Sequence, residues 1–286
     1  MRSWAARFRG VRDVKLDLSQ EVTGFVTTVG APTFEQCCQH LDRQDCRFRR
    51  EVIDHVAPMS AAFQRMLDDC RTPYFVQVDE DMLLHPEAIR TLHATIAAEP
   101  AEVVMYAADL FDPHLERCIV GVKIFRHEIA RRYPFAPVDA FEVDQLARME
   151  ADGFCWRKAT AGRTPVPGQT LGVHEIGSEP ERIYERYRRL ALRAAERPGG
   201  MRWFQEIPGE LLQRFLDDPS EANYLAVQGL IAGTLRADGR VQPARDHRQY
   251  GRAEEMARLH EIFANLTDPA RNEGSGEKST RTRLRS

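Results

Sequence analysis

Apolar runs of strand length alternate with amphipathic helical patterns through the first third of this 286-residue chain. The runs have the length and the β-branched or aromatic content of buried strands. The predicted strands are residues 22–29, 51–56 and 74–78. Helical spacing of apolar residues follows each of them, and Thr33 and Gln36 have the spacing of a capping box at the first helix. Alternation of this kind predicts an α/β fold with a mostly parallel sheet flanked by crossover helices.

The alternation continues as far as residue 159 and then gives way to helical patterns only. Further strands are predicted at residues 102–107, 118–125 and 154–159, with a helix at 138–152 that Gly153 ends. Residues 162–172 are rich in glycine, proline and threonine, which predicts a loop. We therefore expect an α/β domain at residues 1–179, an all-helical extension at 180–271 and a disordered tail at 272–286, which has almost no apolar residues.

Composition narrows the classes of function. Hydrophobic residues make up 43% of the chain and charged residues 29%, and a net charge of −3 makes no general case for nucleic acid binding. No apolar run approaches the roughly 20 residues that span a bilayer. Trp4, Phe8 and Val11 lie at helical spacing among arginines. This pattern is typical of a short capping helix or of a segment that rests on an anionic membrane surface.

Six cysteines are present and none forms a C-x-x-C pair. Several occupy apolar positions of predicted helices and strands, which indicates buried thiols in a reducing compartment. The early residues carry charges where a signal peptide needs an apolar stretch, so secretion is not expected. The expected location is the cytoplasm, and peripheral contact with the inner face of the membrane is an alternative.

Three carboxylates, Asp79, Glu80 and Asp81, follow directly on the predicted strand 74–78. Acids grouped at the mouth of a buried strand repel one another and are costly to desolvate. A bound divalent cation removes both objections, because Mg²⁺ and Mn²⁺ prefer carboxylate oxygens and bridge to substrate phosphates. A solvated acidic turn is the structural alternative.

Other polar residues are expected at the same edge of the sheet. Thr27 and Thr28 end the first predicted strand and Asp54 lies near the end of the second. In open α/β sheets ligands bind at the carboxyl ends of the strands. These residues are therefore candidates for contact with a bound nucleotide, although an aspartate at a strand end also commonly caps a turn.

Three later features complete the set of candidates. Glu142 and Asp144 begin the predicted helix 138–152, where they do not share a face. A first-turn acid is also favoured by the helix dipole, and Arg148 is placed to pair with Asp144 one turn later. His174 follows the predicted loop, and Gly121 opens a strand that leads into a helix.

Over about residues 22–178 the chain resembles the family 2 glycosyltransferases of GT-A fold, with the motifs in the family's order. Residues 26–30 match the family's first strand, and Asp54 matches the acid that receives the nucleotide base. Asp79-Glu80-Asp81 match the D-x-D motif, where metal and nucleotide diphosphate bind. Residues 121–126, opened by Gly121, resemble the glycine and aromatic segment beside the donor sugar.

The resemblance extends to the catalytic residues. Glu142 falls on the position of the catalytic base, Asp144 on that of the second acid, and His174 on the late histidine that joins the metal or diphosphate. Two departures are visible: Phe141 stands where the family's paired acids begin, and residues 56–58 replace an Asn-Asp-Ser-Thr-like stretch. The implied fold is a GT-A-type, Rossmann-like, mostly parallel sheet with helices.

The resemblance implies a Mn²⁺- or Mg²⁺-dependent enzyme that transfers a sugar from a UDP- or GDP-sugar, with inversion, to a glycan, lipid-linked or protein hydroxyl. A metal-dependent phosphohydrolase also uses D-x-D at a strand end, but its nucleophilic aspartate is commonly on the first strand. A sugar nucleotidyltransferase would need a Gly-rich opening loop with basic residues, which residues 22–41 do not contain. A non-catalytic binding protein on a transferase fold is the remaining alternative, and Phe141 favours it.

Overall fold

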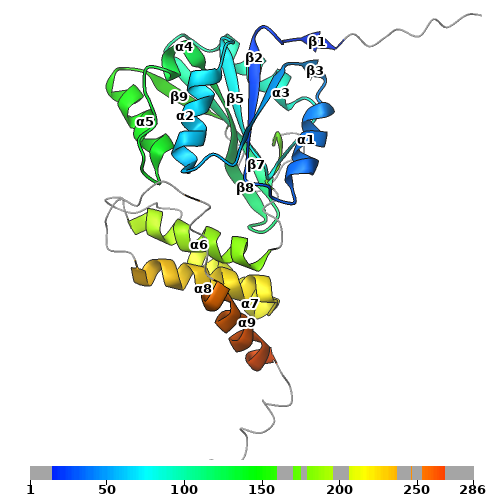
Figure 1. Ribbon diagram of the computed structural model, residues 1–286, viewed down its shortest axis with the longest axis vertical. Helices are drawn as coiled ribbons and strands as arrows, with labels where there is room; N and C mark the ends of the chain where they lie inside the picture. The colour runs from blue at the N-terminus through cyan, green and yellow to red at the C-terminus, as the bar shows by residue number, and fades with distance from the viewer. Residues whose placement is uncertain are drawn as a thin grey trace, which may run out of the picture. The chain divides into compact units, whose positions relative to one another are not determined.

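The computed structural model describes residues 15–159, 170–174, 179–195, 206–236, 246 and 253–267 (Figure 1). The chain divides into two compact units. The first takes its residues from Met1–Val56, Ala61–Ala136 and Glu142–Glu175, and the second from Ala57–Ser60, Pro137–Phe141 and Ile176–Ser286. The arginine-rich N-terminal segment, most of the predicted loop and the predicted tail at 272–286 lie outside the described residues.

An eight-stranded mixed sheet forms the centre of the first unit. In spatial order the strands are β4 (Arg49–Asp54), β2 (Val22–Thr28), β5 (Tyr74–Asp79), β8 (Arg117–Arg126), β7 (Val103–Asp112), β10 (Gly172–His174) and β6 (Met82–Leu84), with β9 (Cys155–Lys158) beside β7. β4, β2 and β5 run parallel, whereas β8 is antiparallel to both β5 and β7. The predicted α/β fold is confirmed, and its antiparallel part arises because a tight turn joins β7 directly to β8.

Four short strands were not predicted from the sequence. β1 (Leu16–Asp17) and β3 (Cys46–Arg47) form a separate parallel pair, and β6 and β10 extend the main sheet. Each has only two or three residues. A run that short has no measurable alternation, so its pairing is visible only in three dimensions.

Helices cover both faces of this sheet. They are α1 (Phe34–Asp42), α2 (Met59–Asp69), α3 (Ala88–Ala98), α4 (His127–Ala130) and α5 (Phe141–Ala151). Figure 1 shows α1 and α2 on opposite sides of β2 and β5. Leu41 of α1 and Leu92 of α3 belong to one buried cluster with Val26, Val78 and Ile124 of the strands. Alternate strand residues face the other way and form an aromatic row, in which Phe75 stacks on Phe125 at 4.8 Å and meets Phe25 edge-on at 6.3 Å.

The predicted capping box at α1 is wrong. Thr33 already has helical backbone angles (φ −75°, ψ −15°), and its side chain makes no capping hydrogen bond. Its buried hydroxyl has no hydrogen-bond partner within the described residues. In the loop before the helix, Glu80 accepts a hydrogen bond from Ala31 N at 2.8 Å. A distant carboxylate thus stabilises the loop that leads into α1.

The second unit is helical, as the patterns beyond Pro180 predict. It contains α6 (Pro180–Ala195), α7 (Ile207–Asp217), α8 (Glu221–Arg236) and α9 (Ala253–Thr267). α8 crosses α6 closely, because two of its glycines lie against the α6 backbone. A Cβ on Gly229 would be 2.2 Å from the carbonyl oxygen of Tyr184, and one on Gly233 would be 2.1 Å from that of Arg188. Among the described helices, none has the length and apolarity that a membrane crossing requires.

This contact predicts the effect of a single methyl group. Gly229→Ala should lower the free energy of unfolding by about 1–3 kcal/mol, because backbone cannot yield as a flexible side chain does. Gly209→Ala is the matched control, since nothing lies within 4 Å of its added Cβ. In α7 that change should stabilise by up to about 1 kcal/mol through helix propensity. Urea unfolding of both variants measures the difference, and equal stabilities would contradict the close crossing.

Candidate active site

The carboxyl ends of β2, β4 and β5 bring several of the candidate residues to one edge of the sheet. In the parallel register Thr27 lies opposite Asp79, and Thr28 lies opposite Asp54. The Thr27 hydroxyl donates a hydrogen bond of 2.8 Å to Asp79 Oδ1. Asp79 is thereby held at the mouth of β5 by the neighbouring strand.

The surroundings of Asp79 disfavour the ionised form of its carboxyl group. Its pKa is raised from 3.8 to about 6, chiefly by burial and also by the negative charges of Asp81 and Glu142, against the lowering effects of Thr27 and Lys123. Carboxylates that raise one another's pKa are expected where a cation normally shares the site. The cost of ionising Asp79 therefore points to a positively charged ligand.

Glu80 has a different role from its two neighbours. Its Oε2 accepts hydrogen bonds from the Thr28 hydroxyl at 2.5 Å, from Val29 N at 3.2 Å and from Ala31 N at 2.8 Å. The side chain is buried. It ties down the loop between β2 and α1, and it occupies the hydroxyl of Thr28, which the sequence had suggested as a nucleotide contact.

Asp81 faces a histidine that comes from far along the chain. His174 Nε2 lies 3.7 Å from Asp81 Oδ1, and His174 Nδ1 lies 3.1 Å from Oδ2 of the fully buried Asp112. Asp81 Oδ1 is buried and has no hydrogen-bond partner within the described residues. Asp112 Oδ1 accepts from Leu115 N at 2.8 Å, so this carboxylate is fixed in position. Asp112 was missed in the sequence, where it reads as an ordinary turn residue.

These side chains suit a hard divalent cation, although the described residues hold no group of three or more histidine, cysteine or acidic side chains already gathered around one point. Mg²⁺-type sites are commonly completed by substrate phosphates and water, with only one or two protein carboxylates. The buried, unpartnered oxygen of Asp81 and the raised pKa of Asp79 are what such a partial site predicts. Asp79, Asp81 and His174 are the residues that could hold the metal.

Glu142 and Asp144 are separated in the structure, as the helical spacing predicts. Glu142 Oε1 lies 2.5 Å from Lys123 Nζ, whereas Asp144 pairs with Arg148 at 3.0 Å along the helix. The Lys123 side chain is only 16% exposed. Sequence reasoning missed Lys123, although a charge between Val122 and Ile124 in an apolar strand was a usable signal.

Two residues that the sequence predicts to contact the donor, Asp54 and Gly121, have surroundings unlike those of the acidic cluster. Asp54 is exposed and contacts His55, its neighbour in the chain. Gly121 is buried, and a Cβ there would be 2.3 Å from Cγ of Leu110. The missing side chain of Gly121 thus serves the packing of β8 on β7. Within the described residues, neither Asp54 nor Gly121 forms a hydrogen bond with the acidic cluster.

The raised pKa of Asp79 predicts a pH dependence of stability. Between about pH 4 and about pH 6 the folded protein keeps a proton that the unfolded chain has lost, so stability falls as pH rises through this window and levels off above it. Asp79→Asn removes this titration. Urea unfolding in EDTA should show wild type losing on the order of 2 kcal/mol more than the variant across the window. Parallel curves for the two proteins would contradict the raised pKa.

Comparison with known proteins identifies no family. No family model matches the chain. No curated protein matches it.

Similar solved structures include a mannosyltransferase from Pyrobaculum calidifontis in complex with GDP-Man and Mn²⁺, with 15% identity, a TM-score of 0.41 and coverage of 92% of this chain and 86% of that one. S. aureus TarS (1–349) has 14% identity and a TM-score of 0.41, covering 89% and 82%. Glucosyl-3-phosphoglycerate synthase from Mycobacterium tuberculosis, with Mn²⁺, UDP and phosphoglyceric acid, has 13% identity and a TM-score of 0.40, covering 49% and 67%. These three structures are GT-A-type glycosyltransferases, the class that the sequence resembles.

Proposed function

We propose that this protein is a metal-dependent glycosyltransferase that moves a sugar from a nucleotide-diphosphate sugar to an acceptor hydroxyl. The observation that carries the proposal is the Asp79–Asp81 pair at the end of β5. One of its carboxyls has a raised pKa, and the other has a buried oxygen without a hydrogen-bond donor in the described residues. A cation shared with a diphosphate satisfies both groups at once.

Asp79, Asp81 and His174 would hold Mn²⁺ or Mg²⁺ in this proposal. When bound, the metal acts as a Lewis acid that stabilises the negative charge developing on the departing diphosphate. Asp112 orients the His174 ring from the side opposite Asp81. Its carboxylate pairs with Nδ1 of the ring, so Nε2 is directed toward Asp81. Thr27 fixes Asp79 in the same way.

Glu142 is proposed as the general base that takes the proton of the acceptor hydroxyl. Its ion pair with Lys123 holds the carboxylate in place and tethers the start of α5 to strand β8. Attack by the acceptor on the face of the sugar opposite the diphosphate would invert the anomeric centre. Asp144, paired with Arg148, is proposed as an accessory acid.

The donor is proposed to be a UDP- or GDP-sugar, with Thr27, Thr28, Asp54 and Gly121 on the donor side. The acceptor is proposed to be the hydroxyl of a glycan, a lipid-linked sugar or a protein.

We further propose that the protein is cytoplasmic, with contact at the inner membrane face through its N-terminus. All six cysteines are free, which suits a reducing compartment. The domain division proposed is a catalytic domain at 1–179 and a helical extension at 180–271.

A thermal-shift panel tests the proposal. UDP, GDP and their hexose derivatives are added to the protein with Mn²⁺ or with EDTA, and ADP and CDP serve as matched controls. A ligand at 100 times its dissociation constant stabilises the native state by about 2.7 kcal/mol, a shift of several degrees. We expect one nucleotide to raise the melting temperature only when Mn²⁺ is present. A panel without any metal-dependent shift would favour the binding-protein alternative.

A further inference from the structure

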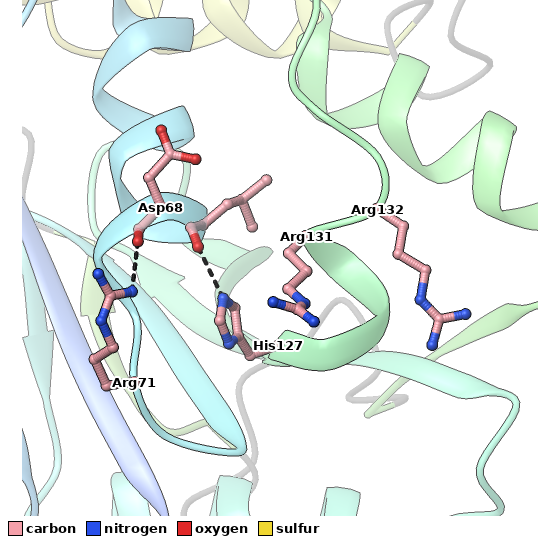
Figure 2. Close-up of a pocket in the computed structure, with 6 residues that line it drawn as sticks. Asp68, Arg71, His127, Arg131 and Arg132 are labelled. Atoms are coloured by element: carbon pink, nitrogen blue, oxygen red, sulfur yellow. Dashed lines mark hydrogen bonds between the residues drawn. The ribbon is translucent and has the colours of Figure 1, made fainter.

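A polar cavity lies at the opposite end of β5 from the acidic cluster. It has a volume of about 480 Å³ and is lined by Leu67, Asp68, Arg71, His127, Arg131 and Arg132 (Figure 2). Arg71 precedes β5, and His127 N donates a hydrogen bond of 2.9 Å to Pro73 O, just before the strand begins. The six residues of β5 separate this cavity from Asp79 by roughly 17–20 Å, at about 3.3 Å per residue. The cavity is therefore too far away to belong to the site proposed above.

The cavity carries an excess of positive charge. Arg71, Arg131 and Arg132 contribute guanidinium groups, and Asp68 is the only acid in the lining. The Asp68 carboxylate accepts from Gln64 Nε2 at 2.9 Å, and in Figure 2 it points away from the arginines. Arg131 pairs with Glu128 at 3.0 Å. Neither Arg71 nor Arg132 forms an ion pair with any carboxylate of the described residues.

Capping of α2 explains only part of this arrangement. Arg71 Nη1 donates to the carbonyl oxygen of Asp68 at 2.6 Å, and His127 Nε2 lies 2.8 Å from that of Leu67, at the end of the helix. These contacts satisfy carbonyls that the helix leaves unpaired. Arg132 does not contact α2: its Nε donates to the backbone oxygen of Glu128 at 3.1 Å. Its two terminal nitrogens have no partner within the part of the chain that the structure describes.

We propose that this cavity binds the phosphate groups of a small soluble molecule of the diphosphate class. Guanidinium groups recognise phosphate oxygens with paired, charge-assisted hydrogen bonds, and three of them line this cavity. The volume lies in the range of small-molecule sites. Leu67 is the one apolar residue of the lining and is itself buried, so the lining that a ligand meets is mainly polar.

The experiment measures binding of pyrophosphate to the full chain by isothermal titration calorimetry in EDTA. The chelator prevents metal-dependent binding at Asp79 and Asp81, so the outcome is independent of the proposed transferase activity. Wild type and Asp81→Ala should bind equally and saturably, more tightly at low ionic strength. The Arg131→Gln/Arg132→Gln double variant should lose roughly tenfold in affinity, because charge-assisted hydrogen bonds are removed.

Arg49→Gln is the matched control, since Arg49 is an exposed arginine on β4 outside the cavity. It should bind pyrophosphate as wild type does. If the double variant is less stable, Arg132→Gln alone tests the same point, because within the described residues that side chain donates its hydrogen bond to a backbone oxygen. Unchanged affinity in the arginine variants, or no pyrophosphate binding by wild type, overturns the proposal. Binding to phosphatidylserine vesicles without binding to pyrophosphate overturns the small-molecule assignment in favour of a lipid headgroup.

Discussion

Asp81→Ala should abolish Mn²⁺-dependent binding of the nucleoside diphosphate, with a loss in affinity of at least roughly 100-fold. Residues that merely orient metal ligands are worth up to about that factor, and Asp81 is proposed as a ligand itself. The measurement is calorimetric titration of UDP or GDP, whichever the panel identifies, in the presence and absence of Mn²⁺. Electron paramagnetic resonance of free Mn²⁺ gives a second readout that does not require the nucleotide.

The same variant should fold at least as well as wild type when metal is absent. Asp81 is one cause of the raised pKa of Asp79, and its Oδ1 is buried without a hydrogen-bond partner in the described residues. Removing it relieves both costs, so the melting temperature in EDTA should be unchanged or higher. Asp69→Ala is the control, because Asp69 forms only an exposed pair with Arg65 at the end of α2. Metal-dependent nucleotide binding that survives in Asp81→Ala would remove the metal site from this edge of the sheet.

Glu142→Gln should lower turnover by roughly 10²–10⁴-fold, the usual contribution of a positioned general base. Glutamine is nearly isosteric, and its carbonyl oxygen can still accept from Lys123, so the contact between β8 and α5 is kept. It cannot take a proton from an acceptor hydroxyl at neutral pH. Release of nucleoside diphosphate from the identified donor measures the rate, and donor affinity should hardly change because the base contacts the acceptor.

Asp144→Asn is the matched control for this prediction. Asp144 lies on the same helix but points about 200° away at 3.6 residues per turn, and its partner is Arg148 on the helix itself. A larger loss of turnover in Asp144→Asn than in Glu142→Gln would assign the base to Asp144. Full activity in both variants would favour the non-catalytic alternative.

Much of this architecture was predictable because the signals are local. Strand length, β-branched content and helical spacing predict β2, β5 and α1–α3, and strand–helix alternation predicts that Thr27 and Asp79 lie at one edge of the sheet, as they do. The i, i+4 pair of Asp144 and Arg148 followed from helix geometry alone. The cap at α1 was predicted wrongly, because the spacing of Thr33 and Gln36 cannot show that the backbone of Thr33 is already helical.

The sequence by itself determined the order of the elements, the edge where the carboxylates gather and the helical nature of the second unit. Only the tertiary structure decided which of those carboxylates has which partner. Asp112 meets His174 across 62 positions of the chain, Thr28 meets Glu80 across 52, and Lys123 meets Glu142 across 19. Such contacts depend on strand order and register, which periodicity within one segment does not encode. The partners of the acidic cluster are therefore a property of the folded sheet, since the D-x-D triplet alone does not show that Glu80 is tied to the loop before α1 while Asp81 lies beside His174.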